Sequence, residues 1–366
     1  MVNRTDPTSN APIMMLSAGN GFIMQSEKYS RDNAGQSLKK YILLKKGELA
    51  YNHGASKAKQ YGCCYELTEN EARIPYVYHC FKISGTEHTP YVATALNNPK
   101  IDRQLKRLVS SSVRMDGLLN ISFDDYMSVI LHLPSLKEQT HIADFLKKFD
   151  ERITSQEKLV ASLKKYKRGV NNQILSQIDN SYNCRLGSVC EIVGGGTPDT
   201  LHTEYWGNTV EWFTPSEIGK TKYVNNSVRK LSDIGLDNSS AKLLPIGTVL
   251  LTTRATLGEM SIAKQECSTN QGFQSLIPHT DRVSSEYLYY MQIIIKPWCE
   301  KYASGNTFRE ISKSALSDCI IPIPDRARQE QIVKLLSSID MLIGAAESIS
   351  MSLSKIRHGL MQQLFI

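Results

Sequence analysis

The sequence lacks the features of several large classes of protein. It contains no run of about 18 apolar residues, so no membrane-spanning helix is expected. Its first dozen residues are polar, which does not fit a secretory signal. The eight cysteines show no Cys-x-x-Cys spacing and no paired histidines accompany them. We therefore expect no metal site, and free thiols in a reducing cytoplasm.

Catalytic motifs are missing as well. An adenine methyltransferase should carry Asn/Asp-Pro-Pro-Tyr/Phe, but the nearest string, Asn97-Asn98-Pro99-Lys100, lacks the second proline and the aromatic residue. There is no glycine-rich AdoMet loop and no Walker lysine. Pro324-Asp325 followed by Glu330-x-Ile332 lacks the lysine of a nuclease core. We expect no catalytic residue and no cofactor in this chain.

The composition leaves room for two domains. A chain of 366 residues is too long for one ordinary core, and its apolar fraction of 41% supplies sizeable cores. The net charge of +7 permits nucleic-acid binding without proving it. Many basic residues lie along one stretch, where most would form a solvated helix face: Lys147, Lys148, Arg152, Lys158, Lys164, Lys165, Lys167 and Arg168.

A long repeat organises the chain. Residues 134–176 recur without a gap at 324–366, a constant shift of 190 residues. Twelve of the forty positions from Pro134 to Gln173 are identical in the second copy. This period is much longer than a solenoid unit. The chain is therefore built twice, as a globular segment followed by a helix, which permits approximate two-fold symmetry within one chain.

Both copies carry a heptad pattern in the same register, which is typical of a coiled-coil seam. We predict that the two helices pack together, antiparallel, as a spacer between the globular segments. The interface residues expected are Ile142, Leu146, Phe149, Ile153, Leu163, Ile332, Leu336, Ile339, Ile343 and Leu353. Lys167 and Arg357 place a cation at the same apolar register position in both copies. Such a charge either fixes register or meets a partner, or it snorkels at a helix end.

The two globular segments both look mixed. Short β-like runs at 41–44, 76–78, 248–251 and 275–277 are broken by turn residues. The segments share two phrases, since Leu43-Leu44-x-x-Gly47 matches Leu243-Leu244-x-x-Gly247 and Ile121-Ser122 matches Ile311-Ser312. The run Gly194-Gly195-Gly196 is no phosphate loop, because no Gly-Lys-Ser/Thr follows. We interpret it as a tight turn that needs unusual backbone angles.

Several motifs carry a resemblance to a known family. The phrase Gly-Gly-Thr-Pro…Tyr-Trp-Gly…Trp-x-Thr-Pro within 195–215, the string Asn270-Gln271-Gly272-Phe273-Gln274, and Pro134, Glu138, Gln139 and Ile142 as Pro-x-x-x-Glu-Gln-x-x-Ile are such motifs. The chain resembles the DNA-specificity (S) subunit of type I restriction–modification systems. The fold class implied is α+β, with two mixed α/β target-recognition domains separated by two long helices packed as an antiparallel coiled coil in pseudo-two-fold arrangement. The domains expected are recognition domain 1 at 1–133, helical spacer 1 at 134–178, recognition domain 2 at 179–323 and helical spacer 2 at 324–366.

The chain departs from the family pattern in two places. Arg328 stands where the pattern expects Glu. The first segment has no counterpart of 186–198, and its Ile13-Met14-Met15-Leu16-Ser17 matches the region near Trp212–Ser216. We therefore expect recognition domain 1 to be short by about 25 residues at its amino end. Its ability to read DNA depends on whether the domain works without these residues.

The resemblance implies a division of labour. This chain would read a bipartite double-stranded DNA target through the major groove, where all four base pairs can be distinguished. Two methyltransferase (M) subunits would dock on the helical regions, bind AdoMet and flip the target adenine, and restriction (R) subunits would join for cleavage. The chain itself would be a non-catalytic subunit in a bacterial or archaeal cytoplasm.

Loop residues of suitable chemistry are candidates for DNA contact. Arg pairs with guanine and Asn with adenine, whereas Lys more often positions the phosphate backbone. The candidates are Arg31, Asn52, His53, Lys57 and Lys59 in the first segment, and Thr214, Ser216, Lys220, Lys222, Arg254, Thr256, Asn306 and Arg309 in the second. Arg254 is the strongest, because it follows the strand expected at 249–252 in a turn that ends at Gly258.

Two other interpretations stay open at this point. The domains could bind protein, with the helices only holding them apart, as in a two-domain interaction scaffold without DNA reading. The chain could also be the recognition half of a larger single-chain enzyme. The second helix ends at Ile366 in register with Ser176, as expected of a natural carboxyl end, which disfavours the latter.

Overall fold

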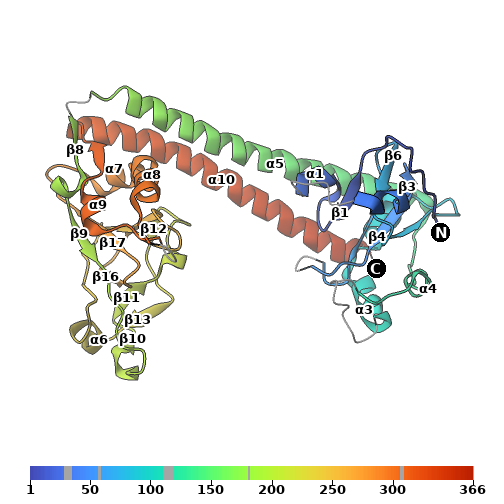
Figure 1. Cartoon of the computed structure of the whole chain (residues 1–366), viewed down its shortest axis with the longest axis horizontal. Helices are drawn as coiled ribbons and strands as arrows, with labels where there is room; N and C mark the ends of the chain where they lie inside the picture. The colour runs from blue at the N-terminus through green and yellow to red at the C-terminus, as the bar shows by residue number, and fades with distance from the viewer. Residues whose placement is uncertain (29–34, 57–58, 110–118, 180–181, 306–308, 366) are drawn as a thin grey trace. The chain divides into compact units, whose positions relative to one another are not determined.

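A computed structural model describes residues 1–28, 35–56, 59–109, 119–179, 182–305 and 309–365. The chain divides into two compact units, unit 1 (Met1–Lys158 and Glu347–Ile366) and unit 2 (Leu159–Ala346). The divisions fall inside two long helices, α5 (Leu136–Ser176) and α10 (Arg326–Leu364). Each unit therefore holds a mixed helix-and-sheet segment and part of both helices (Figure 1). In the described residues, no helix is long and apolar enough to span a membrane.

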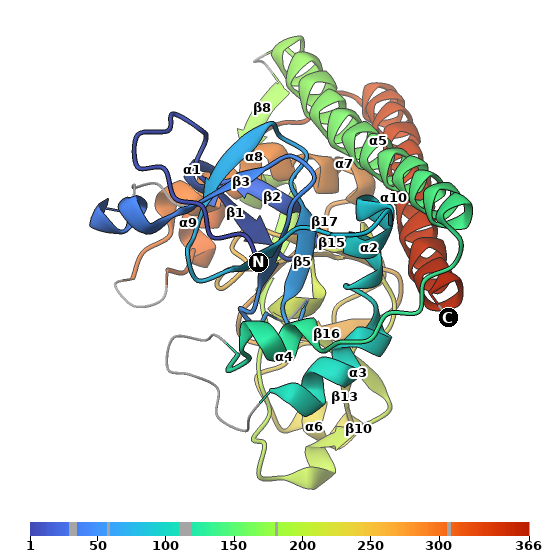
Figure 2. The same ribbon diagram turned by 90° about the vertical axis from the view of Figure 1, so that its right-hand side faces the viewer.

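In its described residues, unit 1 forms small antiparallel sheets. β1 (Met14–Ser17) pairs with β2 (Gly21–Met24), β3 (Ile42–Lys45) with β6 (Glu71–Ile74), and β4 (Leu49–Asn52) lies between β5 (Cys63–Glu66) and β7 (His79–Phe81). The helices are α1 (Gln25–Lys28), α2 (Thr89–Ala95), α3 (Pro99–Leu108) and α4 (Phe123–Met127), with a 3-10 turn at Gly35–Lys40. Helices α3 and α4 lie side by side (Figure 2). Leu49, Tyr51 and Phe81 share a core with Tyr91 and Tyr126.

Unit 2 is built on a five-stranded sheet and a four-stranded sheet. The first has the order β12 (Tyr223–Val224), β15 (Met260–Ala263), β14 (Val249–Leu251), β17 (Gln274–Pro278), β9 (Cys190–Gly194). The second has the order β10 (Trp206–Gly207), β13 (Arg229–Leu231), β11 (Val210–Phe213), β16 (Cys267–Thr269). β8 (Asn183–Arg185) pairs with β18 (Ile320–Pro322). The helices are α6 (Asp233–Asp237), α7 (Ser285–Tyr290), α8 (Gln292–Tyr302) and α9 (Lys313–Ser317), with 3-10 turns at Leu186–Ser188, Thr203–Tyr205 and Pro215–Glu217.

The shared sequence phrases have structural reasons. Gly47 and Gly247 both adopt positive φ, +83° and +86°, in the turns that lead into β4 and β14. Only glycine adopts this conformation without strain. Ser122 and Ser312 are the N-caps of α4 and α9, where each hydroxyl accepts a backbone N–H of the first turn. The two units thus repeat one local framework.

The expected strands are confirmed at three of four places, as β3, β14 and β17. The prediction at 76–78 is wrong. These residues form a turn closed by the Tyr78 N–H, which donates to the Pro75 carbonyl at 3.1 Å, and β7 begins one residue later at His79. Pro75 cannot donate to a ladder, so β6 ends before it and the chain turns.

The long helices pack against each other within each unit. In unit 1 the start of α5 shares a core with the end of α10, through Leu146, Met361 and Phe365. In unit 2 the end of α5 shares a core with the start of α10, through Ile174, Ile332 and Leu336. Both pairings are antiparallel. All predicted interface residues are buried or half-buried: Ile142, Leu146, Phe149, Ile153, Leu163, Ile332, Leu336, Ile339, Ile343 and Leu353.

A repeated glutamine joins each helix to its globular segment. Gln139 and Gln329 are equivalent in the repeat and only 3% and 1% exposed. Each amide oxygen accepts the N–H of a helix N-cap, His88 of α2 at 2.9 Å and Ser284 of α7 at 3.1 Å. Each amide nitrogen donates to the carbonyl of the proline five residues earlier, Pro134 or Pro324. The repeated Pro…Gln pattern is therefore a structural anchor.

Candidate nucleic-acid interface

Three loops of unit 2 meet around Arg254. They follow β11, β14 and β16, and they comprise 214–218, 253–258 and 270–272. A Cβ placed on Gly272 would lie 3.0 Å from Pro215 Cγ and 3.2 Å from Arg254 Nε, so the three loops touch at this point. The Thr256 hydroxyl also donates to the Pro215 carbonyl at 3.3 Å. Any larger residue at 272 would push against the Arg254 side chain.

The first loop is fixed by a capping box. The Thr214 hydroxyl and N–H both donate to Glu217 Oε2, at 2.6 and 2.8 Å, while the Val228 N–H donates to Glu217 Oε1 at 2.8 Å. Glu217 is thus occupied inside the loop. Ser216 is exposed, and its hydroxyl lies 3.1 Å from that of Thr214. Lys220 is exposed just after Gly219, which has φ +85°. Ser216 and Lys220 are therefore accessible to a ligand.

The second loop holds Arg254 in a constrained turn. The Thr252 side-chain oxygen donates to the Thr256 carbonyl at 2.5 Å and accepts the Glu259 N–H at 3.0 Å. Ala255 is left at φ +60°, the only non-glycine residue with positive φ in the described part of the chain. Such strain persists only where the surroundings enforce it, and it clusters at functional sites. Arg254 itself is half-buried and makes no recorded ion pair with a described residue.

The third loop is an Asx turn. The Gly272 N–H donates to Asn270 Oδ1 at 2.8 Å, and the Gly272 carbonyl accepts the Thr253 N–H at 2.8 Å. The Thr197 hydroxyl donates to the Gln271 side chain. The string 270–274, noted for its resemblance, therefore builds the wall beside Arg254.

Two of the predicted DNA contacts in unit 2, Lys222 and Arg309, have hydrogen-bond partners within the unit. Lys222 Nζ donates to Tyr290 Oη and Ser337 Oγ, both at 3.2 Å, so it lies against α7 and α10. Burial and the like charge of Lys167 lower the pKa of Lys222, against the attraction of Glu286 and Asp340. Arg309 donates to the carbonyls of Glu300 and Ala303 and caps the end of α8. Both side chains therefore have hydrogen-bond partners within unit 2.

The described candidates of unit 1 are also occupied. His53 is 6% exposed, and both ring nitrogens have backbone partners, with Nδ1 2.9 Å from the Leu119 carbonyl and Nε2 3.0 Å from the Val77 carbonyl. Asn52 accepts the Gly54 N–H, and Lys59 Nζ donates to the Asn97 carbonyl at 2.8 Å. Three further candidates lie outside the described residues: Arg31, Lys57 and Asn306.

The sequence analysis did not identify a cluster of two tryptophans and one arginine in unit 2. Trp206 and Trp212 pack edge to face at 5.1 Å, and Arg229 Cζ lies 3.4 Å from the centre of the Trp206 ring. Trp212 Nε1 donates to the Gly196 carbonyl at 2.9 Å. The tryptophans were visible in the sequence as part of the resemblance, but Arg229 carried no signal.

Glycine is required at 194–196 for a different reason from the one predicted. Gly194, Gly195 and Gly196 all lack positive φ. A Cβ on Gly195 would lie 2.0 Å from the Asn270 carbonyl oxygen, and one on Gly196 would lie 2.4 Å from Ala241 N. Close approach of two backbones, and not unusual angles, requires glycine there.

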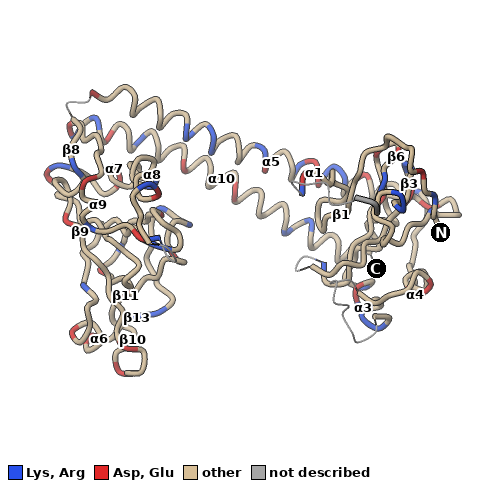
Figure 3. The backbone as a smooth tube through the Cα atoms, viewed as in Figure 1, with Lys and Arg blue, Asp and Glu red and all other residues tan. Residues whose placement is uncertain are grey.

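Lys and Arg are spread along α5 (Figure 3). The two cations at apolar register positions, Lys167 on α5 and Arg357 on α10, each form an ion pair. In unit 1, Arg357 donates to both carboxylate oxygens of Asp150, with Nη2 3.0 Å from Oδ2, and these bonds raise the pKa of Arg357. In unit 2, Lys167 Nζ lies 2.5 Å from Asp340 Oδ1 and 5.2 Å from the Tyr290 ring centre. Asp150 and Asp340 are equivalent in the repeat, as are Lys167 and Arg357, so the two pairs are reciprocal.

Most of unit 2 matches a known domain family. Residues 179–351 match the family described as the type I restriction modification DNA specificity domain. These residues therefore carry a domain of that family, and the resemblance predicted from the sequence is confirmed.

Named relatives agree with this family. The chain is 35% identical over 186 residues to the type I restriction enzyme MjaIX specificity subunit of Methanocaldococcus jannaschii, which covers 50% of this chain and 43% of that protein. It is 27% identical over 222 residues to the EcoR124I/EcoR124II specificity subunit of Escherichia coli, covering 57% and 53%. The chain thus spans about half the length of these relatives.

Solved structures show the same fold over nearly the whole chain. A chain solved in work on complex assembly and conformational transition of the type I R-M system aligns with a TM-score of 0.61 and 18% identity, covering 100% of this chain and 94% of that one. The type I restriction-modification S subunit from M. genitalium aligns with a TM-score of 0.56 and 14% identity, covering 99% and 90%. The mixed helix-and-sheet class with long paired helices is thereby confirmed.

Proposed function

We propose that this chain is the non-catalytic DNA sequence-specificity subunit of a type I restriction–modification complex. It reads a bipartite target, with unit 1 and unit 2 each reading one half. The carrying observation is the meeting of three loops around Arg254 within residues that belong to a DNA specificity family. An arginine with no acidic partner among the described residues, held in a constrained turn, is preorganised to donate two hydrogen bonds to a guanine edge.

The long helices supply the remaining functions. We assign them to docking two methyltransferase (M) subunits and to setting the spacing of the half-targets, as dimer geometry sets half-site spacing in other DNA-binding proteins. The side of α5 that faces away from the seam is exposed and basic, with Lys147, Lys148 and Lys158 among its residues. AdoMet would be bound by the M subunits, which transfer the methyl group, and R subunits would join for cleavage.

Methylation mapping tests this proposal. The chain is expressed with its cognate M subunit, and methyladenine is mapped in the host DNA. Two different half-motifs at a fixed spacing are expected. A palindromic motif would mean that one unit reads DNA in a dimer. A stable complex with the M subunit but no methylation would contradict DNA reading by unit 1, and no complex at all would favour a protein-interaction scaffold.

A further inference from the structure

The four-stranded sheet of unit 2 carries an exposed arginine that is stacked on a tryptophan. Arg229 begins β13, and its Cζ lies 3.4 Å from the centre of the Trp206 ring and 5.6 Å from that of Trp212. Arg229 is exposed, and the preceding Val228 is 86% exposed. The guanidinium is therefore oriented by a flat aromatic contact at a position that solvent can reach.

The charge of Arg229 differs from that of the next cation along the strand. Lys230 Nζ forms an ion pair with Glu211 Oε1, and the other oxygen of Glu211 accepts the Ser227 N–H at 2.6 Å. Glu211 is thus occupied by other groups, although it lies on the neighbouring strand β11. Arg229 has no recorded acidic partner in the part of the chain that the structure describes. Its positive charge is therefore not compensated there.

The backbone that carries Arg229 is tied to the loops around Arg254. The Val228 N–H donates to Glu217 Oε1 at 2.8 Å, and Glu217 is the carboxylate that closes the loop 214–218. β13 itself is held on both sides, because it lies between β10 and β11 in the sheet. Arg229 therefore has a fixed position relative to the loop cluster of the same unit.

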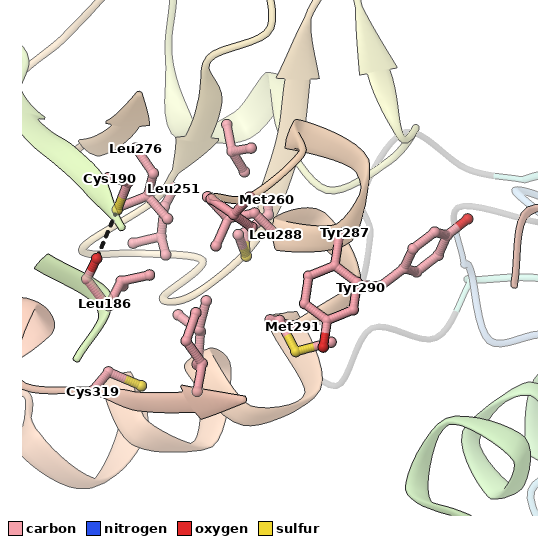
Figure 4. Packing of buried hydrophobic residues seen from close by; sticks show 14 of the residues in the cluster. Leu186, Cys190, Leu251, Met260, Leu276, Tyr287, Leu288, Tyr290, Met291 and Cys319 are labelled. Carbon is pink, nitrogen blue, oxygen red and sulfur yellow. Dashed lines mark hydrogen bonds between the residues drawn. The ribbon is translucent and has the colours of Figure 1, made fainter. Parts of the chain in front are cut away.

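The tryptophan cluster is separate from the main core of unit 2. Figure 4 shows that core, in which Leu251 and Met260 pack together with other apolar side chains. Trp206 and Trp212 belong instead to a smaller cluster on the four-stranded sheet. Within unit 2 this sheet lies at the end away from α5 and α10 (Figures 1 and 2). Removing the Arg229 side chain should therefore leave the main core and the helices in place.

We propose that Arg229 binds a phosphate of the DNA backbone and so positions the duplex against the loops around Arg254. This inference rests on the proposed DNA reading. A stacked guanidinium keeps its N–H donors in one plane and presents two of them together, which matches two oxygens of a phosphate. Phosphate contacts fix the register of a protein on a duplex but carry no sequence information.

The flat placement of Arg229 favours a phosphate over a base. A base edge in the major groove lies about 8.5 Å deep, so the side chain that contacts it must project from its surface. The Arg229 guanidinium lies instead against the Trp206 ring of its own sheet. From there it meets groups on the outside of a duplex, and these are the phosphates.

The salt dependence of DNA binding tests this assignment. The full chain with its cognate M subunit is titrated with a duplex of mixed sequence, from low to physiological salt, because a phosphate contact needs no particular sequence. Arg229→Ala should weaken binding about tenfold at low salt and lower the salt slope by about one. The methylation motif should stay the same. Arg229→Lys keeps the charge but not the planar pair of donors, so it should restore the slope and only part of the affinity.

The matched control is Arg185→Ala, which removes the same charge from an exposed arginine of unit 2 that pairs with Asp318 at 3.4 Å. An affinity and a salt slope for Arg229→Ala equal to those of this control would overturn the phosphate contact. A changed base in the motif with an unchanged slope would also overturn it, because Arg229 would then read a base. A lowered thermal midpoint as the only effect would show a structural role and overturn it as well.

The same titration separates this inference from the proposed function. If the unaltered complex does not bind the duplex, DNA reading itself is contradicted, and the phosphate contact with it. If the complex binds and Arg254→Ala relaxes the motif, but Arg229→Ala behaves like Arg185→Ala, then DNA reading stands and only the role of Arg229 is wrong.

Discussion

At the scale of single residues, Arg254 is the side chain on which DNA reading should depend most. Arg254→Ala removes the guanidinium but leaves the turn, because Thr252 and Gly258 hold its backbone. We expect a loss of about 1–3 kcal/mol in specific DNA binding, or relaxed preference at one base position. Competition binding and methylation mapping measure this loss.

The control for Arg254 is Arg326→Ala. Arg326 is an exposed arginine of the same unit whose recorded ion pair is with Glu330 on its own helix. Equal losses in the two variants would show a general charge effect, and unchanged affinity and motif in Arg254→Ala would remove Arg254 from the site.

Gln329 should matter for the stability of the fold and not for DNA reading. Gln329→Ala leaves the Ser284 N–H and the Pro324 and Arg282 carbonyls without their partner in a buried place. We expect a loss of about 1–3 kcal/mol in the free energy of unfolding. Chemical denaturation measures it, with Gln331→Ala as the control, because Gln331 is exposed on the same helix. A loss of unfolding free energy no larger than that of Gln331→Ala would contradict the role of Gln329 as an anchor.

The sequence predicted the place of Arg254 because a strand and a glycine bound its turn. It did not show the hydrogen-bond partners of Lys222 and His53, for a common reason. Lys222 is directed by Tyr290 and Ser337, which lie 68 and 115 residues away along the chain. The direction of a polar side chain is set by such remote partners, and one sequence without contacts does not carry that information. Arg229 was missed likewise, since its stacking on Trp206 depends on strand pairing.

At the scale of elements, the helices were predictable and the sheets were not. The heptad is local and occurs twice, so register could be read directly from spacing. The sheet order β12-β15-β14-β17-β9 joins strands from both ends of the segment. The sequence showed short apolar runs, but which run pairs with which is decided by non-local packing.

The four-stranded sheet of unit 2 should lose stability in acid. Burial raises the pKa of Glu211, but hydrogen bonds from Lys230 and Ser227 outweigh it and hold the pKa below its ordinary value. A lowered pKa means that the contribution is present above about pH 4.3 and is lost as the pH falls below that. Unfolding followed by tryptophan fluorescence should show this dependence, since Trp212 lies in the same sheet.

Glu211→Gln provides the test of that assignment. The amide keeps the size of the side chain but does not titrate, so the variant should be less stable near neutral pH and should show a weaker dependence between pH 3 and 5, a window set by the ordinary carboxyl pKa. An unchanged pH profile would place the acid sensitivity in other groups.

At the scale of the whole molecule, the proposal that each unit reads one half of the target predicts that the two halves can be changed separately. Changes to the loops around Arg254 should alter one half of the recognised motif and leave the other half and the spacing unchanged. Mapping methylation in variants with Ser216→Ala and Lys220→Ala tests this separation. Changes in both halves at once would contradict independent reading by the two units.

DNA affinity should also fall steeply with salt, because phosphate contacts release counterions. Lys220→Ala should weaken binding to all sequences alike and lower the salt slope by about one if Lys220 contacts phosphate. Binding isotherms between low and physiological salt measure the slope. An affinity independent of salt would favour the protein-interaction scaffold over DNA reading.

The reciprocal ion pairs have a consequence for recombination between the repeats. Asp340 and Arg357 lie 17 residues apart on one helix, about 26 Å at ~1.5 Å per residue, and cannot meet each other. If recombination deleted one period of 190 residues, the product would carry one acid and one cation, each without its partner. Two such half-length molecules, placed antiparallel, would satisfy both charges at once. A duplication that joined two such molecules into one chain would therefore start from a helix interface that is already self-complementary.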